Sequence, residues 1–439
     1  MHDTHPSTGW HWSARIAFRF LFAYFTLAFA SAIVALVPLG EVVGGWIDLV
    51  RQPLYVWIGR AVFGAEITVF PNGSGDTTYN WVQLVSELTL AMGAAFVWAA
   101  VDRRRTCYPR LRDGLWIAMR FVLASAMFSY GLAKVFEMQF PAPGVGQLLK
   151  RYGDASPMGL LWTFMGASRA YSMFAGWMEI VGGLLLCFRR TQLAGALFTA
   201  GVMVNVFMLN MCYDVPVKIY SFQLLAIALV IAAPDLPRLA CMFLLNRPVA
   251  RADLRGPWTS RTLRRVAFTV KCVWLVVVLG VMVWQTRSMQ RMYISRENRG
   301  WLDGFWQVTE FRRDGQLVPK PGPDAQRWEW LGFVDMPEMR SVSVIEVGGG
   351  KRGWRMDVKD NMLTLLGAPA ASPAASAESA APPPAVGTLE VSREGEQGLR
   401  LRGTIEGVPV QATCERREPA DFLLMNRGFR WINEEPFNR

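Results

Sequence analysis

Seven apolar stretches, each about 20 residues long, constrain the fold of this chain more than any other feature. A helix needs about 20 predominantly apolar residues to cross a hydrocarbon core about 30 Å thick. Charged residues make up only 18% of the chain, against about 25% in an ordinary soluble domain. The sequence therefore predicts a polytopic α-helical membrane bundle of about seven spans. These spans cover residues 16–37, 81–101, 115–135, 167–188, 193–212, 219–237 and 266–284.

The basic residues between the spans predict an orientation. Segments 102–114, 189–192 and 238–265 hold 14 Arg, whereas the alternating segments 39–80, 136–158 and 213–218 hold five Lys or Arg. Cytoplasmic loops carry the excess of basic residues. We therefore expect a bacterial inner-membrane protein with a cytoplasmic N-terminus and a periplasmic C-terminal domain. The net charge of +11 lies mainly between apolar segments, which argues against a nucleic-acid partner.

The scarce residue types limit the cofactors that the chain can hold. Its three histidines, His2, His5 and His11, all precede the first span, and its six cysteines form no C-x-x-C motif. The sequence also lacks a dinucleotide or phosphate-binding glycine motif. We expect no metal and no cofactor bound through the chain's own ligands. A redox role would need a diffusible cofactor such as quinone, or a partner protein.

Polar side chains inside the spans are the candidate site. A charge at the centre of a membrane helix costs about 2.5–3.5 kcal/mol on insertion scales, so each one needs a reason. Tyr130 and Lys134 are four residues apart, and Glu179 shares a face with the small residues Ala175 and Gly183, which favours a position inside the bundle. The predicted orientation gathers these groups into a polar funnel that opens outward. The predicted ligand-binding or proton-relay residues are Lys134, Glu179, Tyr130, Asn205, Asn210, Tyr213, Asp214 and Lys218. No catalytic residue is assigned, and the alternative is that the charged groups pair and fix the helix register.

The chain divides into four predicted regions. Residues 1–114 hold two spans and, over 39–80, an interfacial helix followed by an exposed loop. Residues 115–237 form a four-helix core. Residues 238–300 hold a basic cytoplasmic loop, the seventh span and a juxtamembrane linker. Residues 301–439 form the periplasmic domain.

The last region has the pattern of an all-β fold. Short segments alternate apolar and polar residues and end in turn residues, as in an antiparallel meander. They cover 304–315, 327–334, 340–347, 353–360, 387–394, 398–407 and 408–418. We expect a small closed barrel, whose opening Gly304-Phe305-Trp306 is similar to the start of lipocalin-like barrels. The Ala/Pro/Ser-rich residues 368–386 predict a disordered loop inside this domain, and residues 426–439 a closing strand and strap.

The third and fourth spans carry a family resemblance. They read RFVLASAMFSYGLAKVF and FAGWMEIVGGLLLCFRR, and residues 115–235 resemble the DoxX/DoxD-like superfamily. The matching residues are Arg120, Gly131, Lys134, Gly176, Glu179, Gly182, Gly183 and Arg190. The resemblance implies a four-helix membrane bundle and an oxidoreductase-associated membrane subunit, with one branch linked to thiosulfate:quinone oxidoreductase.

Three functional hypotheses follow from these features. The first is a binding or accessory subunit whose polar site is capped by the periplasmic domain, with the lipid bilayer and a periplasmic or membrane protein as partners. The second is a quinone-linked oxidoreductase subunit that receives electrons from a partner. The third is a small-molecule transporter.

Overall fold

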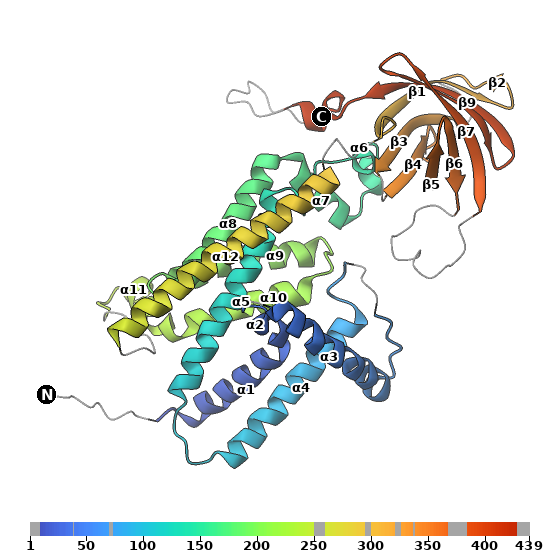
Figure 1. The fold of residues 1–439 in the computed structure, drawn as a ribbon. Coiled ribbons are helices and arrows are strands. Elements are labelled where there is room, and N and C mark those ends of the chain that lie inside the picture. The colour runs from blue at the N-terminus through green and yellow to red at the C-terminus, as the bar shows by residue number, and fades with distance from the viewer. Residues whose placement is uncertain are drawn as a thin grey trace. The chain divides into compact units, whose positions relative to one another are not determined.

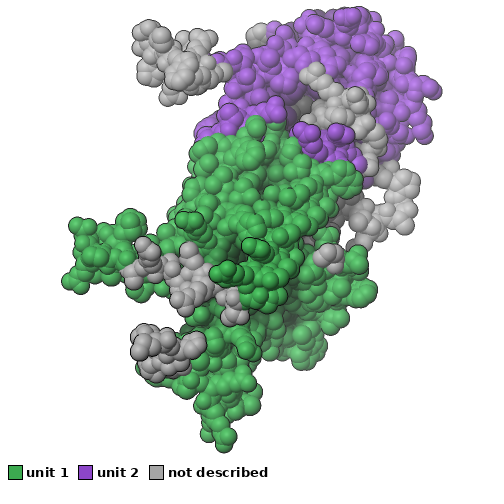
Figure 2. All heavy atoms as spheres, turned by 60° about the vertical axis from the view of Figure 1, so that its left-hand side comes forward, with its two compact units in different colours: residues 1–139, 173–286 green, residues 140–172, 287–439 purple. Residues whose placement is uncertain are grey.

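A computed structural model describes residues 9–37, 39–69, 73–249, 260–294, 300–320, 326–336, 339–367 and 384–427. The chain forms two compact units, which Figure 2 colours separately. The first unit comprises residues 1–139 and 173–286, and the second comprises residues 140–172 and 287–439. Most of the predicted loop 368–386, the tail beyond residue 427, His2 and His5 lie outside the described residues.

The first unit is built from helices (Figure 1). Those that lie wholly or mainly in it are α1 (Trp12–Ala28), α2 (Ala30–Val34), α3 (Gly40–Phe63), α4 (Thr78–Val101), α5 (Pro109–Val135), α8 (Arg169–Cys187), α9 (Gln192–Cys212), α10 (Lys218–Ala232), α11 (Leu236–Phe243) and α12 (Arg261–Ile294). The 3-10 turn η2 (Ala233–Asp235) joins α10 to α11, so residues 218–243 are nearly continuous.

Six of the described helical segments are long and apolar enough to cross a membrane: α4, α5, α8, α9, α10 together with α11, and α12. They correspond to the last six predicted stretches, so the membrane-helix prediction is confirmed at this level. The first predicted stretch, 16–37, is not among them. It divides at Phe29, whose backbone leaves the helical region and separates α1 from α2. The prediction of a seventh span is therefore not supported by one continuous helix.

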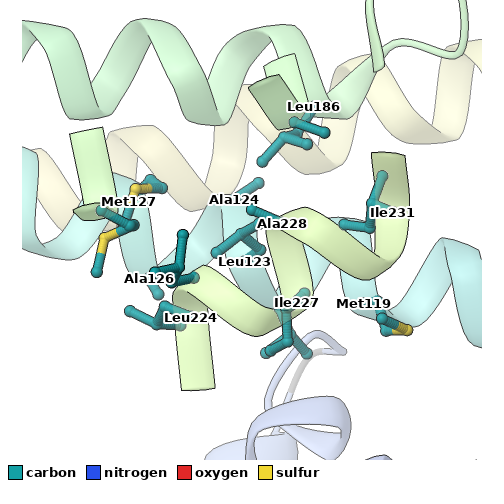
Figure 3. Packing of buried hydrophobic residues seen from close by; sticks show 14 of the residues in the cluster. Met119, Leu123, Ala124, Ala126, Met127, Leu186, Leu224, Ile227, Ala228 and Ile231 are labelled. Atoms are coloured by element: carbon teal, nitrogen blue, oxygen red, sulfur yellow. The ribbon is translucent and has the colours of Figure 1, made fainter. Parts of the chain in front are cut away.

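Helix α5 lies at the centre of the first unit's core (Figure 3). Met119, Leu123 and Met127 follow one another at four-residue spacing and are almost completely buried. They pack with residues of α10, among them Ala228, and with Leu186 of α8. Small residues such as Ala228 let two helix backbones approach closely, which favours van der Waals packing between apolar helices. This packing fixes the position of the C-terminal end of α5, where Lys134 lies.

The second unit contains an eight-stranded antiparallel barrel. Its strands are β1 (Gly304–Arg313), β3 (Trp328–Met336), β4 (Met339–Glu346), β5 (Lys351–Lys359), β6 (Met362–Leu366), β7 (Ala385–Glu394), β8 (Gly398–Ile405) and β9 (Val408–Arg417). Neighbouring strands pair in chain order, and β1 also pairs with β9, which closes the barrel. The short β2 (Gln316–Leu317) extends the end of β1 as a hairpin. The predicted closed barrel is confirmed, although β6 lies outside the predicted strand ranges.

Apolar side chains fill the barrel interior. Trp306, Phe311 and Phe333 are each about 1% exposed, as alternating strand residues on the inner face should be. The remaining interior cavity has a volume of about 10 Å³ and only apolar lining residues. That volume is at the lower limit for a single water molecule. The predicted lipocalin-like start begins the first strand, and the described interior behind it is packed with apolar side chains.

Residues 140–172 pack with the barrel in the second unit. They form α6 (Val145–Leu148), the 3-10 turn η1 (Tyr152–Asp154) and α7 (Pro157–Ala167). Helix α6 contacts β3, and the guanidinium of Arg151 lies against the backbone of Gly349 in the β4–β5 turn. The link between α5 and α8 is thus a structured part of the barrel unit.

Candidate functional site

The ammonium of Lys134 and the carboxylate of Glu179 form a buried ion pair between α5 and α8. Lys134 Nζ donates to Glu179 Oε1 at 2.9 Å and to Oε2 at 2.8 Å. The side chains are only 8% and 3% exposed. A pair this buried keeps little of its interaction with solvent, so each group depends on the other for charge compensation.

Two glycines bring the helices together at the pair. Gly131 lies three residues before Lys134, and Gly176 three residues before Glu179, one helical turn from the charge in each case. A Cβ on Gly131 would lie 2.7 Å from the carbonyl oxygen of Gly176, and one on Gly176 would lie 2.5 Å from that of Gly131. Any larger residue would push α5 and α8 apart. The glycines therefore set the helix separation at which the short Lys134–Glu179 contact forms.

The aromatic ring of Tyr130 lies beside the ammonium of Lys134. Its ring centroid lies 5.6 Å from Lys134 Nζ, within the range of a cation–π interaction. The ring of Tyr220, at the start of α10, lies 6.2 Å from that of Tyr130. The predicted grouping of Tyr130, Lys134 and Glu179 is therefore present, and it combines hydrogen-bond donors, a carboxylate and two aromatic faces.

Asn205 and Asn210, both predicted to belong to the ligand-binding or proton-relay site, lie on different faces of α9. Asn210 is buried, and its Nδ2 donates to Ser221 Oγ at 3.0 Å. Asn205 is exposed. Five residues correspond to a rotation of about 140° around a helix, so the two amides cannot share a face. The structure therefore does not bring Asn205 together with Asn210, and a place for Asn205 in the polar funnel stays a prediction.

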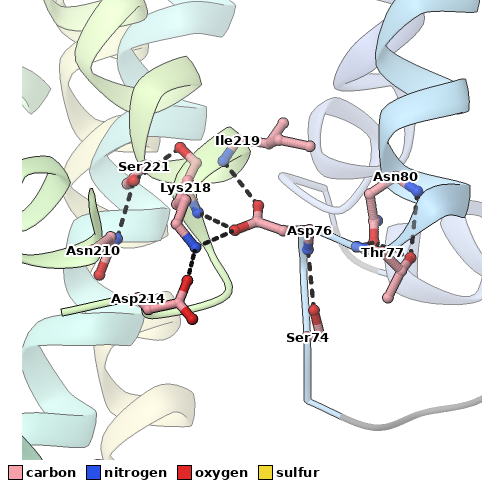
Figure 4. Close-up of polar contacts among 9 residues, drawn as sticks. All are labelled: Ser74, Asp76, Thr77, Asn80, Asn210, Asp214, Lys218, Ile219 and Ser221. Atoms are coloured by element: carbon pink, nitrogen blue, oxygen red, sulfur yellow. Dashed lines mark hydrogen bonds and ion pairs between the residues drawn. The ribbon is translucent and has the colours of Figure 1, made fainter. Parts of the chain in front are cut away.

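The turn between α9 and α10 uses its polar residues to hold a distant loop (Figure 4). The carboxylate of Asp76 accepts hydrogen bonds from the backbone N–H groups of Lys218 and Ile219, at 2.8 and 3.0 Å. Lys218 Nζ also lies 2.9 Å from Asp214 and 3.8 Å from Asp76. Asp76 thus caps the N-terminus of α10, where a carboxylate is favoured.

This arrangement changes the interpretation of three predicted site residues. Asp214 and Lys218 have structural partners in the turn, and Tyr213 is the half-buried residue that ends α9. Sequence reasoning missed Asp76, which lies in the turn-rich stretch PNGSGDTTYN. Its neighbour Thr77 begins α4 with a capping box, a signal that marks the local helix start but not the contact with α10.

A second buried charged cluster joins α3 to α4, and its members are not among the predicted site residues. Glu87 is 1% exposed and forms an ion pair with Arg51. Tyr55 Oη donates to the same carboxylate at 3.2 Å, and Gln83 Nε2 does so at 3.0 Å. Arg51 and Tyr55 share a helix face at i, i+4 spacing, which is the signal that could have found them.

Arg120, the remaining charge in the DoxX-like match of α5, has a backbone partner. It is buried, and its Nε donates to the carbonyl oxygen of Leu186 at 2.8 Å. This hydrogen bond ties α5 to the end of α8. The hydrogen bond between the two helices therefore accounts for the burial of Arg120.

Among the residues that the structure describes, no group of three or more His, Cys, Asp or Glu side chains is arranged to hold a metal ion. The six cysteines are free thiols. The chemistry available at the candidate site is therefore that of Lys134, Glu179 and Tyr130. It consists of hydrogen bonding to an anion or carbonyl, proton exchange and aromatic stacking.

Comparison with known proteins gives a relative but no function. No family model and no solved structure matches the chain, so the DoxX/DoxD-like resemblance stays a prediction. A 127-residue stretch is 33% identical to the uncharacterized protein YwoB of Bacillus subtilis (strain 168), covering 28% of this chain and 79% of that protein. Because the match spans most of the relative, the chain belongs to the same family as the uncharacterized YwoB protein.

Proposed function

We propose that this protein is a membrane-embedded binding or accessory subunit whose site is the Lys134–Glu179 pair with Tyr130. The ligand class is a small or amphiphilic molecule with an acidic or carbonyl head group, which Lys134 binds while Tyr130 packs against its apolar part. The observation that carries the proposal is the ion pair itself, buried between two membrane-length helices. The membrane is the bacterial inner membrane, with the barrel on the periplasmic side.

The energetics of a buried ion pair support a functional role. Replacing such a pair by apolar residues of similar volume is often neutral, or stabilising by about 1–4 kcal/mol. An intramembrane ionisable residue is therefore a functional-site hypothesis by default. Lys134 and Glu179 also belong to the residues that carry the DoxX/DoxD-like resemblance, which supports their assignment to the site.

A quinone-linked oxidoreductase subunit is the second candidate. The Tyr130 ring beside the Lys134 ammonium, with the Tyr220 ring 6.2 Å from that of Tyr130, suits an aromatic molecule with carbonyl oxygens. In that case a partner protein supplies the electrons, and Lys134 or Glu179 supplies or accepts the proton. The two candidates share one site and differ in the ligand.

Native mass spectrometry of the protein extracted with its own lipids tests the proposal. We would compare the wild type with Lys134→Met and Glu179→Gln, and use Glu87→Gln as the matched control because Glu87 belongs to the other buried ion pair. A lipid or small-ligand adduct lost in the first two variants and kept in the control supports the binding subunit. A quinone-mass adduct with the same dependence supports the redox subunit.

The double variant Lys134→Met/Glu179→Met separates ligand binding from helix packing. If the pair only fixes helix register, the double variant regains the stability lost in each single variant, and no adduct depends on either residue. That result would overturn the proposed site. If the pair binds a ligand, the double variant is stable and still lacks the adduct.

A further inference from the structure

Helix α3 exposes apolar side chains where a water-facing helix would expose polar ones. Four large side chains along one side, at positions 46, 49, 50 and 57, are 64–74% exposed. These residues are Trp46, Leu49, Val50 and Trp57. Leu49, Val50 and Trp57 follow Trp46 by three, four and eleven residues. This spacing places all four on one helix face, which we call the α3 stripe.

The opposite face of α3 carries polar and small residues that contact the neighbouring helices, and Asp48 among them keeps an exposed side chain. Asp48 accepts a hydrogen bond from Ser31 Oγ of α2 at 2.6 Å. Arg51 pairs with Glu87 of α4, and the buried Tyr55 donates to the same carboxylate. Gly44 and Gly59, on the same side, are buried against α2 and against Ile67 and Val82. Asp48, Arg51 and Tyr55 therefore have partners within the described first unit, whereas the exposed Glu41 and Arg60 lie near the two ends of the helix.

A helix with polar groups inside and apolar groups outside is stable only if an apolar medium covers its outer face. In water the pattern is reversed, with the apolar stripe facing the core. Within the first unit, α3 contacts α4 and crosses it in the ribbon view (Figure 1), and α4 is one of the membrane-length helices. A helix that crosses a membrane-spanning neighbour, and does not run alongside it, is placed to lie along the membrane surface.

The two tryptophans agree with that position. Indole rings are enriched at the boundary between head groups and acyl chains. Trp46 and Trp57 lie on one face about 16 Å apart along the helix, so both reach one boundary only if the helix lies parallel to it. Interfacial helices place their apolar face about 5–10 Å into the boundary region.

We propose that α3 is an in-plane membrane-interface helix and that the α3 stripe is its lipid-binding surface. The occupant is the boundary layer of the bilayer. The inward cluster of Arg51, Tyr55 and Glu87 holds the helix in this orientation against α4. With 24 residues, α3 is about 36 Å long and could also span a bilayer. Length alone therefore does not decide its orientation, and depth has to be measured.

Photolabelling at two depths in the full-length protein gives that measurement. The protein is reconstituted in phosphatidylcholine bilayers that carry a diazirine either near the glycerol backbone or at the end of an acyl chain. Labelled peptides are identified by mass spectrometry. Helix α9 is the internal control, because exposed Val204 lies near its middle and exposed Met211 lies at its end. The chain-end probe should label Val204, and the glycerol probe should label Met211.

The expected result is that the glycerol probe labels the whole α3 stripe at least about fivefold more than the chain-end probe does. Chain-end labelling at Leu49 and Val50, with glycerol labelling only towards Trp46 and Trp57, would mean that α3 spans the bilayer and would overturn the proposal. Weak labelling by both probes while α9 is labelled normally would also overturn it, since a second copy of the chain or another protein would then cover the stripe.

Discussion

Alanine at Gly131 tests the inference that two glycines set the separation of α5 and α8. The new Cβ would lie 2.7 Å from the carbonyl oxygen of Gly176 and 2.7 Å from Ile180 Cγ1. Ordinary van der Waals contact begins near 3.4 Å, so the helices must separate by about 0.7 Å or distort. The nearest atom belongs to the backbone, which cannot swing aside. Gly201 of α9 is the matched control, because a Cβ there would meet nothing within 4 Å.

The comparison isolates the cost of the clash. Both substitutions replace a glycine inside a helix, so the gain in helix propensity of up to about 1 kcal/mol is common to both. Overpacking a well-packed contact costs about 1–3 kcal/mol. We therefore expect Gly131→Ala to be about 1–3 kcal/mol less stable towards unfolding than Gly201→Ala, and Gly176→Ala to behave like Gly131→Ala.

Reversible unfolding in mixed micelles, with an increasing fraction of denaturing detergent and tryptophan fluorescence as the signal, measures this difference. The reasoning is refuted if Gly131→Ala and Gly201→Ala change the free energy of unfolding equally. Equal values would mean that α5 and α8 can accommodate a Cβ at Gly131 without moving apart.

Two further predictions concern the barrel unit. Gly349→Ala should expose residues 145–154 to faster hydrogen exchange, whereas Gly407→Ala should not. Both glycines have positive φ angles, 85° and 78°, but a Cβ only on the first would meet the Arg151 guanidinium, at 2.5 Å. The added loss of stability should stay within about 1 kcal/mol, since this long side chain can move. Burial raises the pKa of Cys414 from 9.0 to about 12. An unfolded thiol ionises first, so barrel stability should fall as pH rises above 9, by up to about 1.4 kcal/mol per pH unit. Urea unfolding at pH 8 and 10 measures the change in the free energy of unfolding between the two pH values. Cys414→Ala should lose this change, and an equal change in wild type and variant would contradict the prediction.

Part of the candidate site could be predicted because helix periodicity is local. The i, i+4 spacing of Tyr130 and Lys134, and the small residues around Glu179, were enough to predict that these groups face the bundle interior. The same periodicity, applied to Asn205 and Asn210, would have shown that they lie about 140° apart. The prediction grouped the two residues by depth alone and did not consider the helix face.

The other contacts could not be derived from the sequence because their partners are far apart in the chain. Arg51 and Glu87 are 36 positions apart, and Asp76 and the Lys218 backbone are 142 apart. Nothing in either local pattern selects the partner. The choice depends on how α3 and the loop before α4 pack on their neighbours.

The sequence by itself determined the six membrane-length helices and seven of the eight barrel strands, because hydrophobic transfer and side-chain alternation are properties of each segment. It also determined that a closed barrel follows the helices. Only the tertiary structure decided that Lys134 pairs with Glu179 at a glycine contact, that Asp214 and Lys218 hold a loop, and that the barrel is filled by its own side chains. Those outcomes depend on distances between backbones, which are set when all the helices and strands pack together.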